Sequence, residues 1–228
     1  MPDCCLLYYI TDRKAIAPDE PTRRRRLLEK IAEAARAGID YIQLREKDLS
    51  TRELESLARE AIGVLNEIRT DNRDLKTKLL INSRADVALA VGSDGVHLRS
   101  EDISPLDGKV IWERCVTGVL RTRGATQAPL IGVSCHSPSE VLQAEANAAT
   151  FAVFAPVFEK NDAPHTQPAG LSQLREACRA KIAVLALGGI NLENAQACLE
   201  AGASGIAAIR LFQENDIAAI VAQLQTPL

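Results

Sequence analysis

Aromatic side chains are scarce in this sequence, and long hydrophobic runs are absent from it. Aromatic residues make up 4% of the 228 residues, whereas hydrophobic residues of all kinds make up 46%. The apolar residues are mostly Ala, Leu, Ile and Val, as expected where helices cover a parallel β-sheet. No apolar run approaches the roughly 20 residues that a helix needs to cross a bilayer, which argues against a membrane protein.

An excess of positive charge and a recognisable signal peptide are also lacking. The formal net charge is −3, which does not favour bulk electrostatic binding to nucleic acid. The first five residues contain neither the basic segment nor the apolar core of a signal peptide. The basic run Arg23–Arg26 opens a helical pattern in which Glu29 and Glu33 follow at pairing distance. We therefore expect a cytoplasmic protein that binds small molecules rather than nucleic acid or a membrane.

Cysteine is present, but not at the spacings of a metal site. No C-x-x-C pair or other compact ligand spacing occurs among Cys4, Cys5, Cys115, Cys135, Cys178 and Cys198. In helical patterns among Ala and Leu, a thiol behaves as a small hydrophobic side chain. We expect all six to be reduced and structural, with Cys135 lining a pocket because it adjoins candidate site residues.

A single pattern recurs along the chain, consisting of an amphipathic helix, a turn with glycine and a short apolar strand. For example, residues 27–37 have helical periodicity, Gly38 ends it, and a strand follows. Eight strands are predicted, at residues 6–10, 41–44, 79–82, 95–98, 130–134, 151–155, 184–187 and 205–209.

Eight strands alternating with helices fit a (β/α)8 barrel, whose usual size is roughly 200–250 residues. A doubly wound open sheet is the structural alternative, but no G-x-G-x-x-G sequence follows the first strand. Nothing in the sequence marks a domain boundary. The predicted fold class is therefore α/β, with a single-domain (β/α)8 TIM barrel over residues 1–228.

In such a barrel the functional residues lie where the strands end, and the second strand has the most informative end. Alternate residues share a face in a strand, so Gln43, Arg45 and Lys47 would project together. An amide, a planar guanidinium and a mobile ammonium suit a phosphate or diphosphate group. The alternative is a solvated loop in which Arg45 pairs with Glu46 or Asp48, because most short charge runs are of that kind.

Polar residues follow the other strands as well, while the strands themselves are apolar. These residues are Thr11 and Asp12, Asn82 and Ser83, Arg99, Glu101 and Asp102, Ser134, Cys135 and His136, Glu159 and Lys160, Gly188 and Gly189, and Arg210. The contrast between apolar strands and polar, cationic strand ends predicts an anionic ligand.

Several of these residues have both a functional and a structural interpretation. Gly188 and Gly189 could bring backbone N–H groups and a helix N-terminus to a phosphate, or could form a tight turn. Asp102 is the candidate Mg²⁺ ligand, since Mg²⁺ uses one or two carboxylates with substrate phosphate oxygens, or it could cap a helix. His136 could act as an acid or base near neutral pH, or could hydrogen-bond its own loop. His97, inside an apolar strand, is expected to be a hydrogen-bonded core residue.

The chain resembles the thiamine phosphate synthase and thiazole tautomerase superfamily along nearly its whole length, and within it most closely thiamine phosphate synthase. The matching stretches are YITD at 9–12, QLREKD at 43–48, IN at 81–82, RADVA at 84–88, DGVHL at 94–98, GVS at 132–134, PVF at 156–158 and LGGI at 187–190. The resemblance implies a transferase of thiamine biosynthesis. Such an enzyme joins hydroxymethylpyrimidine diphosphate to a thiazole phosphate and releases diphosphate.

The resemblance also implies roles for the matching residues. Those that would bind the pyrimidine diphosphate or the thiazole phosphate are Gln43, Arg45, Lys47, Asn82, Ser134, Gly188 and Gly189. Lys160 and Arg210 join this set of binding residues by their positions after the sixth and eighth strands. Of these, Arg45, Lys47 and Ser134 would also be catalytic, together with His136. Asp102 would bind Mg²⁺, which stabilises the departing diphosphate while positive charge develops on the pyrimidine methylene.

Three features depart from the synthase pattern. Ser83 stands where an Asp, a second metal ligand, usually follows the Asn of the third strand, so metal binding should weaken. The loop after the sixth strand lacks the usual threonines, and Lys160 would replace the family lysine. Arg210 stands where Ser is usual, and it could close the phosphate site or remain a surface arginine.

Two other functions are compatible with the sequence. A thiazole tautomerase would act on a thiazole phosphate carboxylate by acid–base chemistry, with His136 as its catalytic residue and without a need for the metal ligands. A non-catalytic regulatory barrel that binds a phosphate ligand is the second alternative. Retention of Asp102 with Gln43, Arg45 and Lys47 favours the synthase. A homo-oligomer is also compatible with the sequence, which does not fix the oligomeric state.

Overall fold

Eight parallel strands close into a barrel in the computed structural model, which describes residues 5–72, 74–117, 128–159 and 167–225. The strands are β1 (Leu6–Ile10), β2 (Tyr41–Leu44), β3 (Lys78–Asn82), β4 (Gly95–Leu98), β5 (Leu130–Cys135), β6 (Phe151–Phe154), β7 (Ala183–Ala186) and β8 (Gly205–Ala208). Each strand pairs with the next, and β8 pairs with β1 in the register Leu6 to Gly205. The predicted α/β (β/α)8 barrel is confirmed, while its extent as one domain over residues 1–228 stays a prediction.

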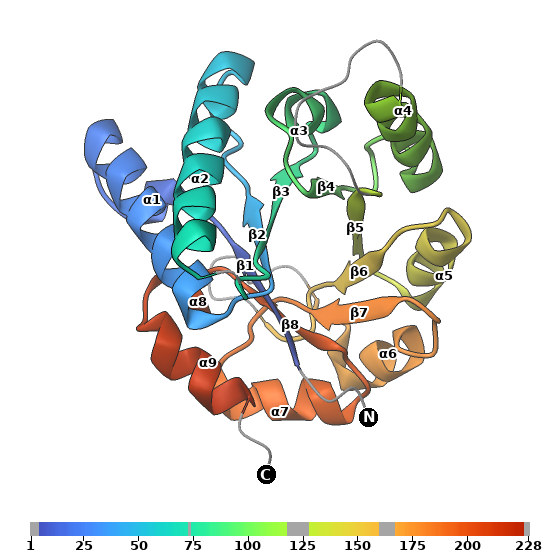
Figure 1. Ribbon diagram of the computed structural model, residues 1–228. Coiled ribbons are helices and arrows are strands. Elements are labelled where there is room, and N and C mark those ends of the chain that lie inside the picture. The colour runs from blue at the N-terminus through green and yellow to red at the C-terminus, as the bar shows by residue number, and fades with distance from the viewer. Residues whose placement is uncertain (1–4, 73, 118–127, 160–166, 226–228) are drawn as a thin grey trace.

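Helices surround the barrel on its outside (Figure 1). They are the 3₁₀ helix η1 (Arg13–Ala15) and the α-helices α1 (Glu20–Ala37), α2 (Thr51–Asp71), α3 (Ala85–Val91), α4 (Pro105–Thr117), α5 (Pro138–Ala146), α6 (Gly170–Ala177), α7 (Leu192–Glu200), α8 (Arg210–Gln213) and α9 (Ile217–Gln225). Helix α1 begins well before its apolar pattern, because Asp19 caps it by accepting a hydrogen bond from the Thr22 N–H. No helix in the described ranges is long and apolar enough to cross a membrane.

Two apolar layers hold the barrel together, one on each face of its strands. Alternate strand residues point outward and pack under the helices, as Ile42, Leu44 and Ile81 do. The others fill the inside of the barrel, which contains Tyr8, Ile10, Leu80, Phe151, Val153, Leu185 and Ala207. The barrel is therefore a packed core rather than a pore.

Aromatic rings fill the middle of the barrel and support the polar strand ends. The Tyr41 and Phe151 rings stack with centroids 5.2 Å apart, and Tyr8 meets Phe151 edge-on at 5.5 Å. Gly132 makes room for them, since a Cβ at this position would collide with the Phe151 ring and lie 2.8 Å from Nδ1 of His97. A site at the carboxyl ends of the strands therefore has a rigid base.

Candidate functional site

A cavity of about 790 Å³ lies at the carboxyl ends of the strands. Most of the predicted site residues line it, namely Gln43, Arg45, Lys47, Asn82, Ser134, His136, Gly188, Gly189 and Arg210. Asp102 adjoins the cavity through its neighbour Glu101, which is part of the lining. Lys160 lies outside the residues that the structure describes.

The prediction that Cys135 lines a pocket is wrong. Its side chain is 1% exposed and packs in the apolar layer between the strands and the helices. Strand alternation explains the error, because Ser134 faces the inside of the barrel and its neighbour must face outward. Burial raises the pKa of the Cys135 thiol to about 12, so this cysteine is an inert core residue.

The charge run after β2 divides its charges between two sides of the chain. Arg45 and Lys47 line the cavity with Gln43, while Glu46 and Asp48 bind Arg13. The alternation expected for a strand thus continues past its last residue. The alternative in which Arg45 pairs with Glu46 or Asp48 is wrong, because both carboxylates already have a partner.

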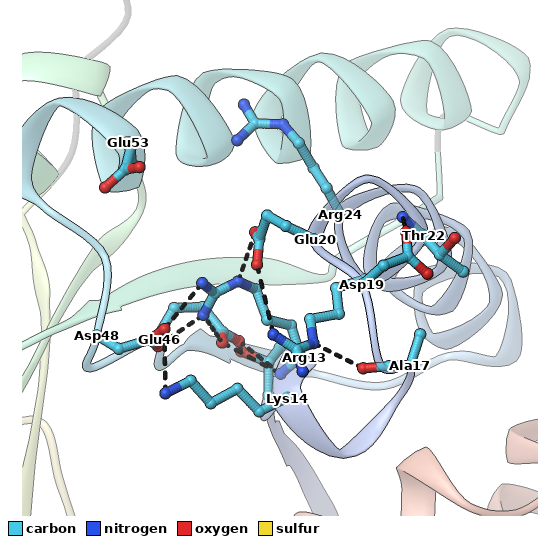
Figure 2. A network of polar contacts seen from close by, with 12 residues as sticks. Arg13, Lys14, Ala17, Asp19, Glu20, Thr22, Arg24, Glu46, Asp48 and Glu53 are labelled. Atoms are coloured by element: carbon cyan, nitrogen blue, oxygen red, sulfur yellow. Dashed lines mark hydrogen bonds and ion pairs between the residues drawn. The ribbon is translucent and has the colours of Figure 1, made fainter.

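Arg13 is the centre of a network of ion pairs (Figure 2). Its guanidinium donates to Asp48 Oδ1 at 2.7 Å, to Asp48 Oδ2 at 3.0 Å and to Glu46 Oε2 at 3.2 Å. Its Nε donates to Glu20 Oε1 at 2.9 Å, which ties the network to α1. Thr11 also donates its hydroxyl to Glu46, at 2.6 Å. The network joins the loops after β1 and β2 and fixes the course of the chain that carries Arg45 and Lys47.

Positive charge is concentrated on the cavity side. The nearby Arg45 guanidinium, partial burial and the Arg99 guanidinium together lower the pKa of Lys47 from its usual value. The largest of these causes, the Arg45 charge, is repulsion between like charges, and Arg99 adds to it. An anion bound between these groups would relieve that repulsion, so the arrangement favours an anionic ligand.

A chain of hydrogen bonds links β2 to the loop after β4. Gln43 donates to Asn82 Oδ1 at 3.0 Å, and Asn82 donates to the Ser83 hydroxyl at 3.2 Å. Burial raises the pKa of Asp102, but hydrogen bonds from Arg99 and Ser83 outweigh this effect and lower the pKa overall. Asp102 is therefore an ionised carboxylate beside the cavity.

Asp102 does not cap α4, which was the structural alternative for this residue. The cap is Ser104, whose hydroxyl accepts a hydrogen bond from the Asp107 N–H at 3.1 Å. Asp102 instead accepts from the Arg99 backbone at 2.8 Å and from the Arg99 guanidinium at 3.1 Å. Within the described ranges, no three His, Cys, Asp or Glu side chains gather into a group that could hold a metal.

His97 joins the barrel core to the cavity. Its Nδ1 is hydrogen-bonded to the Tyr8 hydroxyl at 3.2 Å and its Nε2 to the Ser134 hydroxyl at 2.9 Å. Burial, aided by the Arg45 charge, lowers the pKa of His97 to about 3. The ring is a neutral hydrogen-bonded core residue, as expected, and it also lines the cavity and orients Ser134.

The buried neutral state of His97 should make stability depend on pH. In the unfolded chain its pKa is about 6.5, so between that pH and about 3 only the unfolded state binds the proton. Stability must therefore fall as the pH falls through this range. Between pH 7 and 5, we expect the wild type to lose about 2 kcal/mol more free energy of unfolding than His97→Asn. Urea unfolding at both pH values measures this, and equal losses would show that His97 is not the cause.

His136 lies on the cavity wall with one nitrogen already engaged. Its Nδ1 is 2.6 Å from the carbonyl oxygen of Ala155, just after β6. A carbonyl only accepts, so Nδ1 carries a proton and Nε2 of the neutral ring is the basic atom. The partner of the ring is the residue after the next strand, whereas the His136 backbone N–H donates to Glu140 nearby in the chain. This geometry leaves Nε2 as the candidate acid or base.

Gly188 and Gly189 form a tight turn, with φ angles of 99° and 66°. A side chain on Gly189 would collide with the backbone oxygen of Glu159. In the part of the chain that the structure describes, the N–H groups of Gly189 and Ile190 donate to no backbone or side-chain acceptor. The turn therefore combines both interpretations of the glycines, because it packs tightly and places two N–H groups without a protein acceptor in residues that line the cavity, ahead of α7.

Some lining residues could not be recognised from sequence. Apolar side chains contribute Ile10, Leu187, Ile190 and Ile209, but three of them look like ordinary strand residues and Ile190 like an apolar residue after a turn. The one signal is alternation, since Ile10 occupies the same inward position in β1 that Gln43 occupies in β2. Arg13 was also missed, because a lone arginine after a strand shows neither its burial nor its carboxylate partners.

Comparisons with known proteins show which family this chain belongs to. The family model for thiamine monophosphate synthase, TMP-TENI, matches residues 7–212. The thiamine-phosphate synthase of Syntrophomonas wolfei is 36% identical over 216 residues, covering 92% of this chain and 90% of that protein. The thiamine-phosphate synthase of Clostridium acetobutylicum is 32% identical over 204 residues, covering 89% and 84%.

A comparison with solved structures indicates the same family. The thiamine phosphate pyrophosphorylase from Pyrococcus furiosus is 31% identical to this chain, with a TM-score of 0.73. The match covers 96% of this chain and 93% of that one. With the cationic cavity at the strand ends, these similarities confirm the predicted resemblance: the chain belongs to the thiamine monophosphate synthase family.

Proposed function

We propose that this chain is a thiamine-phosphate synthase, which joins hydroxymethylpyrimidine diphosphate to thiazole phosphate and releases diphosphate. The observation that carries the proposal is the placement of Arg45 and Lys47 on the cavity wall, while the adjacent carboxylates of Glu46 and Asp48 pair with Arg13 instead. Proteins named thiamine-phosphate synthase match over most of the chain. The substrates are small molecules, and we place the enzyme in the cytoplasm.

The cations act on the leaving group in this mechanism. When the bond between the pyrimidine methylene and the diphosphate breaks, the electron pair leaves with the diphosphate and the methylene becomes positive. Arg45 and Lys47 would neutralise the growing negative charge through charge-assisted hydrogen bonds. The amide groups of Gln43 and Asn82 are already linked at 3.0 Å, and this link would hold them ready for the substrate.

The donor groups beside the cavity fit Mg²⁺ with one carboxylate. Mg²⁺ needs one or two carboxylates and otherwise uses water and substrate phosphate oxygens. Asp102 supplies an ionised carboxylate, and Ser83 supplies a hydroxyl instead of a second one. When bound at Asp102, Mg²⁺ would add positive charge next to the departing diphosphate.

Two further parts of the cavity would hold the remaining groups of the substrates. Ser134, fixed by His97 at 2.9 Å, would face the pyrimidine ring. The turn at Gly188 and Gly189 would offer the N–H groups of Gly189 and Ile190 to the phosphate of the thiazole, and Arg210 lines the same cavity. Lys160 would join this group from the loop after β6. The thiazole would then attack the methylene from the side opposite the leaving diphosphate.

Incubating the purified protein with Mg²⁺ and both substrates should release diphosphate, and a coupled assay for diphosphate measures it. The synthase requires both substrates, so each substrate alone is the control. His136→Ala should retain part of the activity, since the ring does not contact the leaving group in this scheme.

A thiazole tautomerase would give the opposite pattern. The two substrates together would release no diphosphate, and conversion of the thiazole phosphate carboxylate would be lost in His136→Ala. Binding of phosphate ligands without either reaction would instead favour a regulatory barrel. Light scattering of the same sample would show whether the protein forms a homo-oligomer.

A further inference from the structure

Arg99 is a cationic residue of the cavity wall that has no role in the proposed synthase mechanism. It follows β4 directly and lines the cavity together with Arg45 and Lys47. Its side chain is 52% exposed, so its donors are accessible from the cavity. It also contributes to the lowered pKa of Lys47, which places its charge close to the ammonium.

Asp102 holds Arg99 in this position by three contacts within one turn. The Arg99 backbone N–H and Nη2 donate to the carboxylate at 2.8 Å and 3.1 Å, and the Asp102 N–H donates back to the Arg99 carbonyl at 3.1 Å. A guanidinium has five N–H donors, and the bond to Asp102 uses one of them. The others are available to a second anion.

The same contact weakens Asp102 as a metal ligand. A guanidinium hydrogen-bonded to a carboxylate neutralises part of its charge and repels a divalent cation that approaches it. Ser83 supplies a neutral hydroxyl where a second carboxylate would stand, so this position does not compensate for the effect. Carboxylates also line the cavity at Asp12, Glu101 and Glu214, and the Glu101 charge acts on Arg99 together with that of Asp102.

We propose that Arg99 binds the diphosphate group of the substrate directly, so that this chain holds diphosphate with only a weak dependence on Mg²⁺. The inference rests on the proposed function and assigns a further residue to the same site. Arg99, Arg45 and Lys47 would surround the leaving group, with the planar fork of Arg99 suited to two phosphate oxygens at once.

Calorimetric titration of inorganic diphosphate into the full chain tests this, first with EDTA and then with Mg²⁺. In EDTA, Arg99→Ala should weaken the diphosphate affinity about 10- to 100-fold, the usual effect of losing a charge-assisted hydrogen bond. Arg99→Lys should retain part of the affinity. Arg25→Ala is the matched control, because Arg25 is also an exposed arginine paired with a carboxylate, on α1. It should bind like the wild type.

Added Mg²⁺ should improve the affinity of Arg99→Ala by a larger factor than that of the wild type, because Asp102 is then released from the guanidinium. If Arg99 only supported the structure of the loop, Arg99→Ala would not combine a weaker diphosphate affinity in EDTA with a larger gain in affinity from Mg²⁺. Equal affinities of wild type and Arg99→Ala in EDTA would overturn the inference, as would a wild type that binds diphosphate only with Mg²⁺.

The synthase assay separates this inference from the function on which it rests. Release of diphosphate from the two substrates, together with an affinity that does not depend on Arg99, would overturn the inference alone. Binding of diphosphate through Arg99 without any turnover would overturn the proposed synthase and support the inference.

Discussion

Replacing Arg13 by alanine is expected to lower the free energy of unfolding by about 3–5 kcal/mol. Arg13 and Glu46 have side chains only 3% and 2% exposed, and they pair at 3.2 Å. Without the guanidinium, the Glu46 carboxylate would remain buried and lack its counter-charge. Burial already raises the pKa of Glu46 above its usual value despite these hydrogen bonds, so part of the loss would appear as proton uptake. Urea unfolding of both proteins measures the difference.

Arg24→Ala is the control for this prediction. Arg24 also pairs with a glutamate, Glu60, at 2.8 Å, but the two side chains are 28% and 46% exposed. An exposed pair of this kind contributes about 1 kcal/mol or less. Equal losses in Arg13→Ala and Arg24→Ala would show that burial of the Arg13 network does not add stability.

Replacing Arg45 by alanine is expected to reduce kcat/KM for diphosphate release roughly 10²- to 10³-fold, the usual effect of removing one donor that stabilises developing charge. Arg45 lines the cavity, and no carboxylate among the described residues neutralises it. Its contribution should grow as the bond to the diphosphate breaks, so kcat should fall more than the substrate affinity. Steady-state kinetics with both substrates separates these two effects.

Two further variants show whether the loss of kcat/KM in Arg45→Ala comes from the missing guanidinium. Arg45→Lys keeps the charge but not the planar fork, and it should recover part of the activity. Arg59→Ala removes an exposed arginine that pairs with Glu55 on α2, and it should leave the rate unchanged. A loss smaller than about tenfold in Arg45→Ala would fall below the range for such donors and contradict a role at the leaving group.

The strands could be predicted from the sequence because each one is a short apolar run closed by glycine or polar residues. Predicted and observed strands agree to within one residue at each end. The first residues of the helices were harder to predict from the sequence. The apolar pattern of α1 begins at Leu27, but the helix begins at Glu20 because of the cap at Asp19. An N-terminal turn without apolar residues has no periodicity by which to recognise it.

The candidate site could be predicted as a set of residues but not as a set of contacts. Strand ends in a parallel barrel meet at one edge, so Gln43, Asn82 and Ser134 could be grouped without knowing their distances. The partners of the charges could not be inferred, because Glu46 and Asp48 bind Arg13 from a distant part of the chain. Sequence proximity instead suggested Arg45 as their partner.

The alternation of charges after β2 also determines which changes of length this loop can tolerate. Arg45 and Lys47 face the ligand and Glu46 and Asp48 face Arg13 because neighbouring residues point in opposite directions. Deleting one residue before Arg45 would exchange the two sides, as a one-residue slip does in any strand. Carboxylates would then face the ligand, and two cations would face Arg13. An anion site would become a cation site, so insertions and deletions at this point should be tolerated in pairs and not singly.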